Sequence, residues 1–361
     1  GQVTLVTDSS IQFSAWSGNQ SHGWFGGGLS GGSTLSTVDR IDFSNDSVTA
    51  SLRGPLSAAR YGPAATGNSN YGWFGGGATI VPPLSTVDRI DFSNDSATAS
   101  VRGSLSLARS YLAATGNSNY GWFGGGSTPA VVSTVDRIDF SNDSATVSLR
   151  GPLSIEKYQV QTTGNSNYGW FGGGNTPVSA SSSVVDRIDF SNDFTTASVR
   201  GPLNSGRQRA AATGNSNYGW FGCGNAPSTA STVNRIDFSN DSATASARGP
   251  LSSARYHLTA TGNSNFGWFG GGFPAAVSTV DRIDFSNDLV TVSVRGPLSL
   301  AKYQLAATSG QARSSSIRLQ KAGNYGWYVG GSIFVVPNYT YYSRVDRIDF
   351  SNDSSTSIRG S

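Results

Sequence analysis

The chain has little material for catalysis or for metal binding. Its 361 residues include no methionine, one cysteine (Cys223) and two histidines, and Glu156 is its only glutamate. One cysteine cannot form an internal disulfide. His22 and His257 do not occupy equivalent positions in the repeat pattern described below. The chain therefore has too few histidines to favour a Ser–His–Asp triad or a histidine-rich metal site. We predict a protein without enzyme activity and without a cofactor.

The chain also lacks long apolar segments and a strong charge imbalance. Its apolar stretches are only a few residues long, so we expect no transmembrane helix and no membrane insertion. Lysine and arginine number 25 and aspartate and glutamate 22, which leaves a net charge of +3. Proteins that bind nucleic acid concentrate basic residues on one face, and this balance does not favour such a partner. Few lysines with abundant glycine, serine, threonine and asparagine favour a virion or extracellular location.

Repetition dominates the rest of the sequence. The stretch from Ala113 to Gly126, AATGNSNYGWFGGG, recurs with small changes, and a second stretch, VDRIDFSND, follows each copy. The copies are about 50 residues apart for most of the chain, which indicates a repeat architecture. The first stretch is marked in each of its seven copies by one tryptophan: Trp24, Trp73, Trp122, Trp170, Trp220, Trp268 and Trp327.

Each unit is predicted to contain four short strands, a to d. In the unit that begins at Tyr111, strand a is an apolar run that ends at the turn residues GNSN. Strand b spans 120–123 and stops at a glycine triplet. Strand c spans 135–140 and alternates with a period of two, and the SND turn leads into strand d at 145–150. No stretch has a convincing helical period.

Four antiparallel strands in a unit of this length are typical of a β-propeller blade. We therefore predict an all-β protein, a single seven-bladed propeller spanning residues 1–361, in which every blade uses the four strands of one repeat. That scheme does not need a borrowed strand to close the ring, although Val3–Val6 is an alternative closing strand. The expected blades cover about 11–53, 60–102, 109–150, 158–200, 208–248, 256–295 and 303–359.

The units resemble kelch repeats. The resemblance rests on the double glycine that closes strand b, on the aromatic residue in strand c and on the basic residue before strand a, and it extends from Ile11 to Arg359. It departs at one place, because kelch repeats usually carry a tryptophan after the c–d turn, where this chain has Ala145, Thr146 and Val147. The repeat text is also similar to kelch-like repeats in structural proteins of marine bacteriophages, which implies a tail or attachment protein.

The repeated charged and aromatic residues are interpreted as framework. Asp39, Asp42 and Asp46 lack the spacing of an EF-hand loop, so pairing of Asp42 with Arg40 or Arg53 is favoured over calcium binding. The strand-b tryptophans are expected to pack between blades, although sugar stacking is an alternative for them. The strand-d arginines are expected to form ion pairs between strands or blades.

Candidate binding residues come from the places where the units differ. The b–c loops vary in every unit and should share one face of the ring, here called the b–c face. The seventh unit has the longest b–c loop, from which we predict a recognition patch: Phe334, Asn338, Tyr339, Tyr341, Tyr342 and Arg344. The competing interpretation is that these aromatic residues plug the ring or close its seam. A basic insertion in the same unit, with Arg313, Arg318 and Lys321, is expected to contact a partner or an anionic surface from the opposite face.

These observations favour a non-enzymatic binding or structural module, a virion tail or surface attachment protein that recognises a host surface glycan or a virion partner. The alternative is a kelch-type scaffold for protein–protein interaction. An enzyme of the sialidase or oxidase type is a third hypothesis, for which the residues offer the least support. The sequence does not indicate an oligomeric state.

Overall fold

The computed structural model describes residues 21–79, 82–226 and 228–309, together with the strands at 325–335, 338–349 and 357–358. The contacts divide the chain into two compact units. The larger is Gly18–Ser315, and the smaller combines Gly1–Ser17 with Ser316–Ser361. No helix in the described part of the chain is long and apolar enough to span a membrane.

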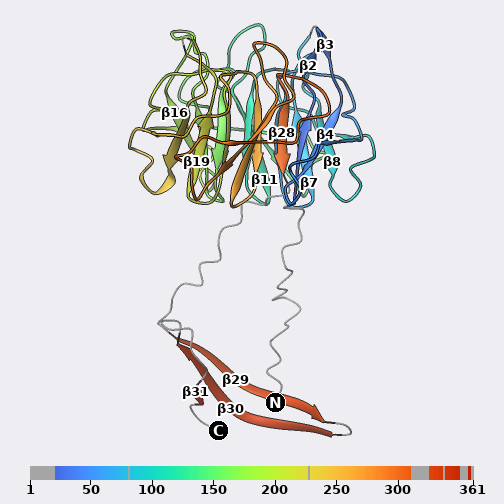
Figure 1. The fold of residues 1–361 in the computed structure, drawn as a ribbon, viewed down its shortest axis with the longest axis vertical. Coiled ribbons are helices and arrows are strands. Elements are labelled where there is room, and N and C mark those ends of the chain that lie inside the picture. Colours follow the sequence, from blue (N-terminus) through green and yellow to red (C-terminus); the bar gives the residue numbers. More distant parts are fainter. Residues whose placement is uncertain are drawn as a thin grey trace. The chain divides into compact units, whose positions relative to one another are not determined.

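The larger unit is a β-propeller whose blades are four-stranded antiparallel sheets, as the sequence predicts (Figure 1). Strands a, closest to the axis, are β6 (Ala64–Gly67), β10 (Ala113–Gly116), β14 (Gln161–Gly164), β18 (Ala211–Gly214), β24 (Thr259–Gly262) and β28 (Ala306–Ser309). Strands b are β1 (His22–Gly26), β7 (Tyr71–Gly75), β11 (Tyr120–Gly124), β15 (Tyr168–Gly172), β19 (Tyr218–Gly222) and β25 (Phe266–Gly270).

The outer half of each blade is equally regular. Strands c are β4 (Val38–Asp42), β8 (Val87–Asp91), β12 (Val135–Asp139), β16 (Val185–Asp189), β22 (Val233–Asp237) and β26 (Val280–Asp284). Strands d are β5 (Ser51–Arg53), β9 (Ser100–Arg102), β13 (Ser148–Arg150), β17 (Ser198–Arg200), β23 (Ser246–Arg248) and β27 (Ser293–Arg295). The b–c loops add the hairpins β2 (Leu29–Ser30) with β3 (Ser33–Thr34) and β20 (Asn225–Ala226) with β21 (Ser228–Thr229), and a 3-10 turn, η1, spans Phe238–Asn240.

The predicted count of seven blades is wrong, because the ring has six. The first blade has the strand order β28-β1-β4-β5, so strand a of the seventh repeat pairs with strand b of the first. The register runs from Gly26↔Ala306 to Gly23↔Ser309. Neighbouring strands a then contact one another around the whole axis, and β28 lies between β24 and β6. The number of repeats in the sequence is right, but closure joins strands from the two ends of the repeat array.

The smaller unit contains the remaining strands of the seventh repeat. These are β29 (Tyr325–Val335), β30 (Asn338–Asp349) and β31 (Ser357–Ile358), in a three-stranded antiparallel sheet of the order β29-β30-β31. A register shift lies between Val329 and Gly331.

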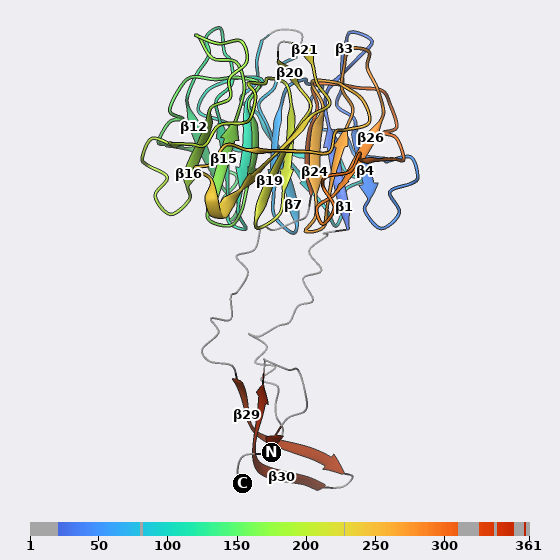
Figure 2. The same cartoon turned by 60° about the vertical axis from the view of Figure 1, so that its left-hand side comes forward.

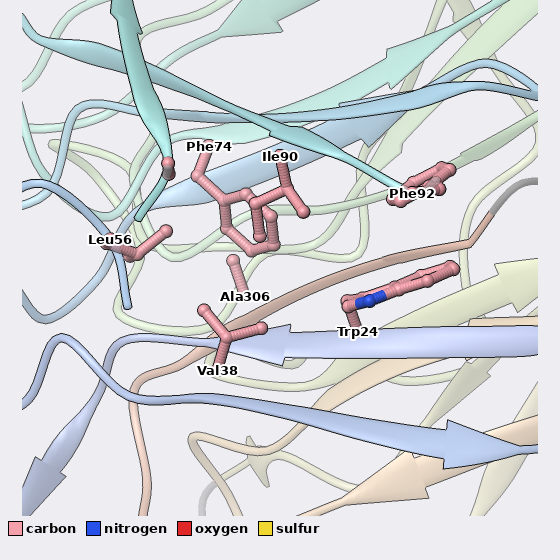
Figure 3. Packing of buried hydrophobic residues seen from close by; sticks show 8 residues of the cluster. Trp24, Val38, Leu56, Phe74, Ile90, Phe92 and Ala306 are labelled. Carbon is pink, nitrogen blue, oxygen red and sulfur yellow. The ribbon is translucent and has the colours of Figure 1, made fainter. Parts of the chain in front are cut away.

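Tryptophan packing holds adjacent blades together. Trp24 of the first blade is fully buried and its ring stacks on Phe92 of the second blade, with centroids 3.9 Å apart (Figure 3). The same cluster contains Phe74 and Ile90 of the second blade and Val38 of the first. The same stack recurs at the other blade interfaces of the ring, and each strand-b tryptophan is 0 % exposed. The prediction that these residues are core is confirmed for the six tryptophans of the ring.

A carboxylate reinforces every blade interface. Asp95 lies in the c–d turn of the second blade. Its Oδ2 accepts a 2.8 Å hydrogen bond from Trp24 Nε1 and forms an ion pair with Arg40 Nη1 at 3.1 Å. Arg53 Nε of strand d lies 3.6 Å from the same oxygen. The expected pairing of Asp42 with Arg40 or Arg53 is therefore wrong. Asp42 instead accepts hydrogen bonds from the amide and hydroxyl of Ser44 within its own turn, and these bonds lower its pKa.

A second set of ion pairs is buried inside the blades. In the third blade Arg109 Nη1 lies 2.8 Å from Asp136 Oδ2, and both side chains are fully buried. Equivalent pairs occur in four other blades: Arg60 with Asp88, Lys157 with Asp186, Arg255 with Asp281, and Lys302 with Asp39. The fifth blade departs from this pattern, because Asn234 replaces the aspartate and Arg207 bonds mainly to carbonyl oxygens. Burial lowers the pKa of Arg207 to about 10.

Candidate functional site: the axial mouth of the propeller

Six equivalent residues surround the axis where the d–a connections enter strands a. Each stands two positions after the buried basic residue of its blade. Their main chains form a closed circle of hydrogen bonds, in which the amide of each residue donates to the carbonyl of the preceding one at 2.7 to 3.3 Å. We call this set the rim ring: Gly62, Tyr111, Gln159, Arg209, His257 and Gln304.

The rim ring lies on the b–c face. The residue before each member pairs with the first residues of a b–c loop, as Tyr303 does with Leu29 and Gln208 with Asn225. The hairpins β2–β3 and β20–β21, which mark this face in Figures 1 and 2, belong to the same loops. The variable loops and the rim ring therefore form one continuous surface.

The backbone of the rim ring is strained. All six members have φ between +53° and +60°, a region that glycine enters freely but other residues rarely adopt. Five of the six are not glycine. Outside the rim ring, Cys223 is the one other non-glycine residue with positive φ in the described part of the chain. Each such residue costs on the order of 1–3 kcal/mol, and strain of this kind gathers at functional sites.

Two aromatic residues from opposite sides of the rim ring meet over the axis. The rings of Tyr111 and His257 have centroids 6.2 Å apart. Gln304 hydrogen-bonds to Tyr111, and its Nε2 lies 3.1 Å from His257 Nε2. Burial raises the pKa of Tyr111 to about 12, with a smaller contribution from Tyr61. Its hydroxyl therefore keeps its proton at neutral pH and can donate a hydrogen bond.

Arg209 supplies positive charge at this mouth. Its Nε donates to Gln159 Oε1 at 3.0 Å, and its guanidinium lies 5.6 Å from the ring centre of Tyr256. None of the residues that line the mouth cavity is acidic, and no ion pair of Arg209 occurs within residues 21–309 as described. Burial, helped by the charge of Arg209, lowers the pKa of His257 to about 3. His257 is thus neutral, and the mouth carries a net positive charge.

The cavity below the rim ring continues along the axis. It measures about 80 Å³ at the mouth, about 160 Å³ between the strands a and about 70 Å³ near the a–b turns. The mouth also contains acceptors without partners among the described residues, since Gln304 Oε1 and Gln161 Oε1 are buried and make no hydrogen bond. Unsatisfied buried acceptors of this kind call for an explanation, and a bound water or ligand hydroxyl is one.

Beside the mouth, the b–c loop of the fourth blade forms an open groove. A surface depression of about 540 Å³ is lined by Tyr158, Arg209 and the loop 175–180, and a second of about 550 Å³ lies on the other side of Ser179. Val178 at the tip of this loop is 86 % exposed. The loops therefore extend the surface outward from the axis.

The residues predicted from the seventh unit do not belong to the ring. Phe334 lies in β29, and the others of the predicted patch lie in β30: Asn338, Tyr339, Tyr341, Tyr342 and Arg344. Phe334 pairs with Tyr339, so the patch forms the end of one hairpin. The described ring has six blades, so the structure does not place this patch on the b–c face of a seventh blade of that ring, and its role in recognition stays a prediction. Arg313, Arg318 and Lys321 lie outside the described residues.

The sequence contains a signal for the rim ring. Within a framework that repeats almost letter by letter, the position two residues after the basic residue changes in nearly every unit. His257 is part of this variation, because the other units have no equivalent histidine. The variation itself is the signal, since a scaffold that repeats its framework varies where it binds.

The described residues contain no group of three or more His, Cys, Asp or Glu side chains that could hold a metal ion. The aspartates cluster with arginines instead, as the ion pairs above show. The rim ring offers neutral donors and acceptors, flat aromatic rings and one guanidinium. Such a set suits recognition of a polar ligand more than the transfer of protons, because a histidine with a pKa of about 3 is a weak base.

His257 should make the fold sensitive to acid. Its pKa is about 3 in the folded chain and 6.5 without burial, so between these values the unfolded chain binds a proton that the folded chain does not. Stability should therefore fall as the pH falls below 6.5, by about 2–3 kcal/mol between pH 7 and pH 4.5. Urea unfolding of the wild type and of His257→Gln over this range measures the effect. The two pH profiles should differ by that amount, and parallel profiles would contradict the assignment.

Comparison with known proteins supports the fold and leaves the function open. No protein-family model matches the chain, and no curated protein matches it. Among solved structures, that of YjhT is similar, with a TM-score of 0.60 and 10 % sequence identity over 77 % of this chain and 97 % of that chain. At this identity the similarity concerns the propeller architecture alone.

Proposed function

We propose that the protein is a non-enzymatic binding module that recognises a surface glycan through the rim ring and the adjoining b–c loops. In this proposal it acts in a virion or another extracellular setting as an attachment protein. The main supporting observation is that five strained, non-glycine residues with different side chains occupy one equivalent position around the axis. A purely structural ring would use glycine, as the second blade does with Gly62.

The chemistry of the mouth supports a sugar ligand that carries a carboxylate or sulfate. Arg209 can hold an anion through two parallel hydrogen bonds, and no acid at the mouth competes for it. Tyr111 and Tyr256 combine flat apolar rings with hydroxyl groups, which suits stacking on a sugar. The free oxygens of Gln304 and Gln161 can accept sugar hydroxyls. The narrow cavity admits an end group, and the longer chain would then lie along the b–c loops.

A glycan array probed with the full chain tests this proposal. The Arg209→Gln variant should bind acidic glycans at least about tenfold more weakly, because it loses a charge-assisted hydrogen bond. Val199→Thr, a change at an exposed position of the outer strand β17 of the fourth blade, serves as the control and should bind normally. Both variants should melt as the wild type does. Equal binding by Arg209→Gln would contradict the role of the rim ring.

A protein partner is the second candidate, and the open groove beside the fourth blade favours it. Its depressions of about 540 and 550 Å³ and the exposed Val178 suit a peptide segment better than a sugar end group. One pair of variants distinguishes a protein ligand from a glycan ligand. For a protein ligand, Val178→Asp should weaken binding more than Arg209→Gln does, and for a glycan the order should reverse.

A further inference from the structure

A collar of apolar side chains lies next to the rim ring. In each blade the residue that follows the rim-ring member lines the mouth cavity and is buried. Five of these residues have bulky side chains and one is alanine: Pro63, Leu112, Val160, Ala210, Leu258 and Leu305. The collar is therefore apolar all round the axis. It is least filled at Ala210, which directly follows Arg209.

One polar side chain interrupts the apolar lining of the channel. The first residue of strand a is alanine in four blades and threonine in the sixth, but in the fourth blade it is Gln161. Gln161 is 5 % exposed and lines the mouth cavity. Its Nε2 donates to the carbonyl of Gln159, and its Oε1 has no hydrogen-bond partner among the described residues. Since the other blades have alanine or threonine here, the fold does not require this amide.

The unpartnered oxygen of Gln161 lies on the same side of the mouth as Ala210. A Cβ atom at Gly173 would lie 3.1 Å from Gln161 Oε1 and 2.5 Å from the carbonyl oxygen of Arg207. The oxygen therefore lies where the fourth blade meets the fifth, close to the segment that runs from Arg207 to Ala210. An acceptor, an apolar gap and the guanidinium of Arg209 are thus brought together on one side of the mouth.

We propose that this side of the mouth binds the acetamido group of a sugar. The inference rests on the proposed function and names the end group of that glycan. The N–H of the acetamido group donates to Gln161 Oε1, and the methyl group beside it fills the gap at Ala210. The carbonyl oxygen of the acetamido group faces the rim ring, where Arg209 has N–H groups to donate.

Other small substituents of a sugar fit this combination less well. A hydroxyl group supplies a donor but leaves the apolar collar unfilled. The methyl group of a 6-deoxy sugar or of an O-acetyl ester fills the collar but brings no donor for Gln161. A buried acceptor that stays unpaired keeps its desolvation cost, and a methyl group that leaves water adds affinity of its own. A site built on a buried acceptor therefore discriminates strongly against ligands without the donor.

Two sulfated monosaccharides that differ only in this substituent test the proposal. N-acetylglucosamine 6-sulfate and glucose 6-sulfate both offer an anion to Arg209, and only the first carries an acetamido group. The full chain should bind the first at least about tenfold more tightly in a ligand-observed NMR titration. In saturation-transfer spectra the acetamido methyl should receive more saturation than any other proton of the sugar.

Two substitutions that copy other blades remove the acceptor and the gap separately. Gln161→Ala introduces the residue of four other blades, and Ala210→Leu introduces the collar residue of three. Each should reduce the preference for the acetamido sugar to about twofold or less, because one of its two contacts is lost. Affinity for glucose 6-sulfate and the melting temperature should not change. Thr259→Ala, the equivalent change in the sixth blade, is the matched control and should keep the full preference.

The possible outcomes separate this inference from the proposed function. Equal affinity of the wild type for the two sulfates would overturn the acetamido site, and so would a preference that survives either Gln161→Ala or Ala210→Leu. In both cases binding of acidic glycans through Arg209 would still stand. If neither sulfate binds and no acidic glycan on the array binds, the proposed function fails, and the acetamido site fails with it.

Discussion

Replacing Gly103 by alanine should destabilise the propeller by at least about 3 kcal/mol. Gly103 follows strand d of the second blade, and its amide donates to the carbonyl of Asp143 in the next blade at 2.8 Å. A Cβ atom at Gly103 would lie 1.7 Å from the carbonyl oxygen of Ala145. The atoms of Ala145 that this Cβ would meet belong to the main chain, so a rotamer change cannot relieve the clash. The blade interface must open, and its buried tryptophan, aspartate and arginine contacts then weaken.

Unfolding of Gly103→Ala in urea at neutral pH measures this loss. Gly31→Ala is the matched control, because Gly31 has φ +54° but a Cβ atom added there would have no neighbour within 4 Å. That control should cost only about 1 kcal/mol, the usual penalty for alanine in the left-handed region. Similar losses for the two variants would show that contact between blades is not what makes the substitution at Gly103 costly.

Breaking the buried ion pair of Arg109 and Asp136 should lower the stability of the propeller by a similar amount. Removing the carboxylate in Asp136→Ala leaves a fully buried guanidinium without its countercharge. The expected loss is about 3–5 kcal/mol, because an unpaired charge in the interior keeps its desolvation cost. The amide of Ser106 also loses its acceptor, since Asp136 Oδ2 receives it at 3.1 Å.

The fifth blade supplies the control for this substitution. There the natural residue is Asn234, which accepts a 3.1 Å hydrogen bond from the amide of Asn204. Arg207 already lies without a carboxylate, so Asn234→Ala should cost only about 1–3 kcal/mol, the loss of a neutral hydrogen bond. The reverse change, Asn234→Asp, should stabilise the chain. If Asp136→Ala costs no more than Asn234→Ala, the pair contributes no electrostatic stabilisation.

Some parts of this framework can be predicted from the sequence, and others cannot. The strands, the turns and the burial of the tryptophans follow from local patterns, since alternation, glycine and asparagine act over a few residues. The partners of Asp95 do not, because Trp24 and Arg40 reach it across a blade boundary. In the sequence the nearest arginine to each aspartate belongs to the same hairpin, and that proximity favours the wrong pairing of Arg40 with Asp42.

The candidate site escapes sequence reasoning for a related reason. A long loop rich in aromatic residues is a strong sequence signal for a binding site, and this signal favours Tyr339 and Tyr341 of the seventh unit. The rim ring consists of single positions about 50 residues apart, and nothing within one unit indicates that Tyr111 and His257 meet. Only the closed circle of strands a brings the centres of their rings within 6.2 Å of each other.

By itself the sequence determined the β-propeller architecture, the four-stranded blade and the residues of its core, because these depend on short-range periodicity repeated many times. The tertiary structure decided the number of blades, the residues at the axial mouth and the partner of every framework aspartate at a blade interface. Ring closure depends on the pairing of β28, from the seventh repeat, with β1, from the first, and such a long-range partner is not encoded in any local pattern.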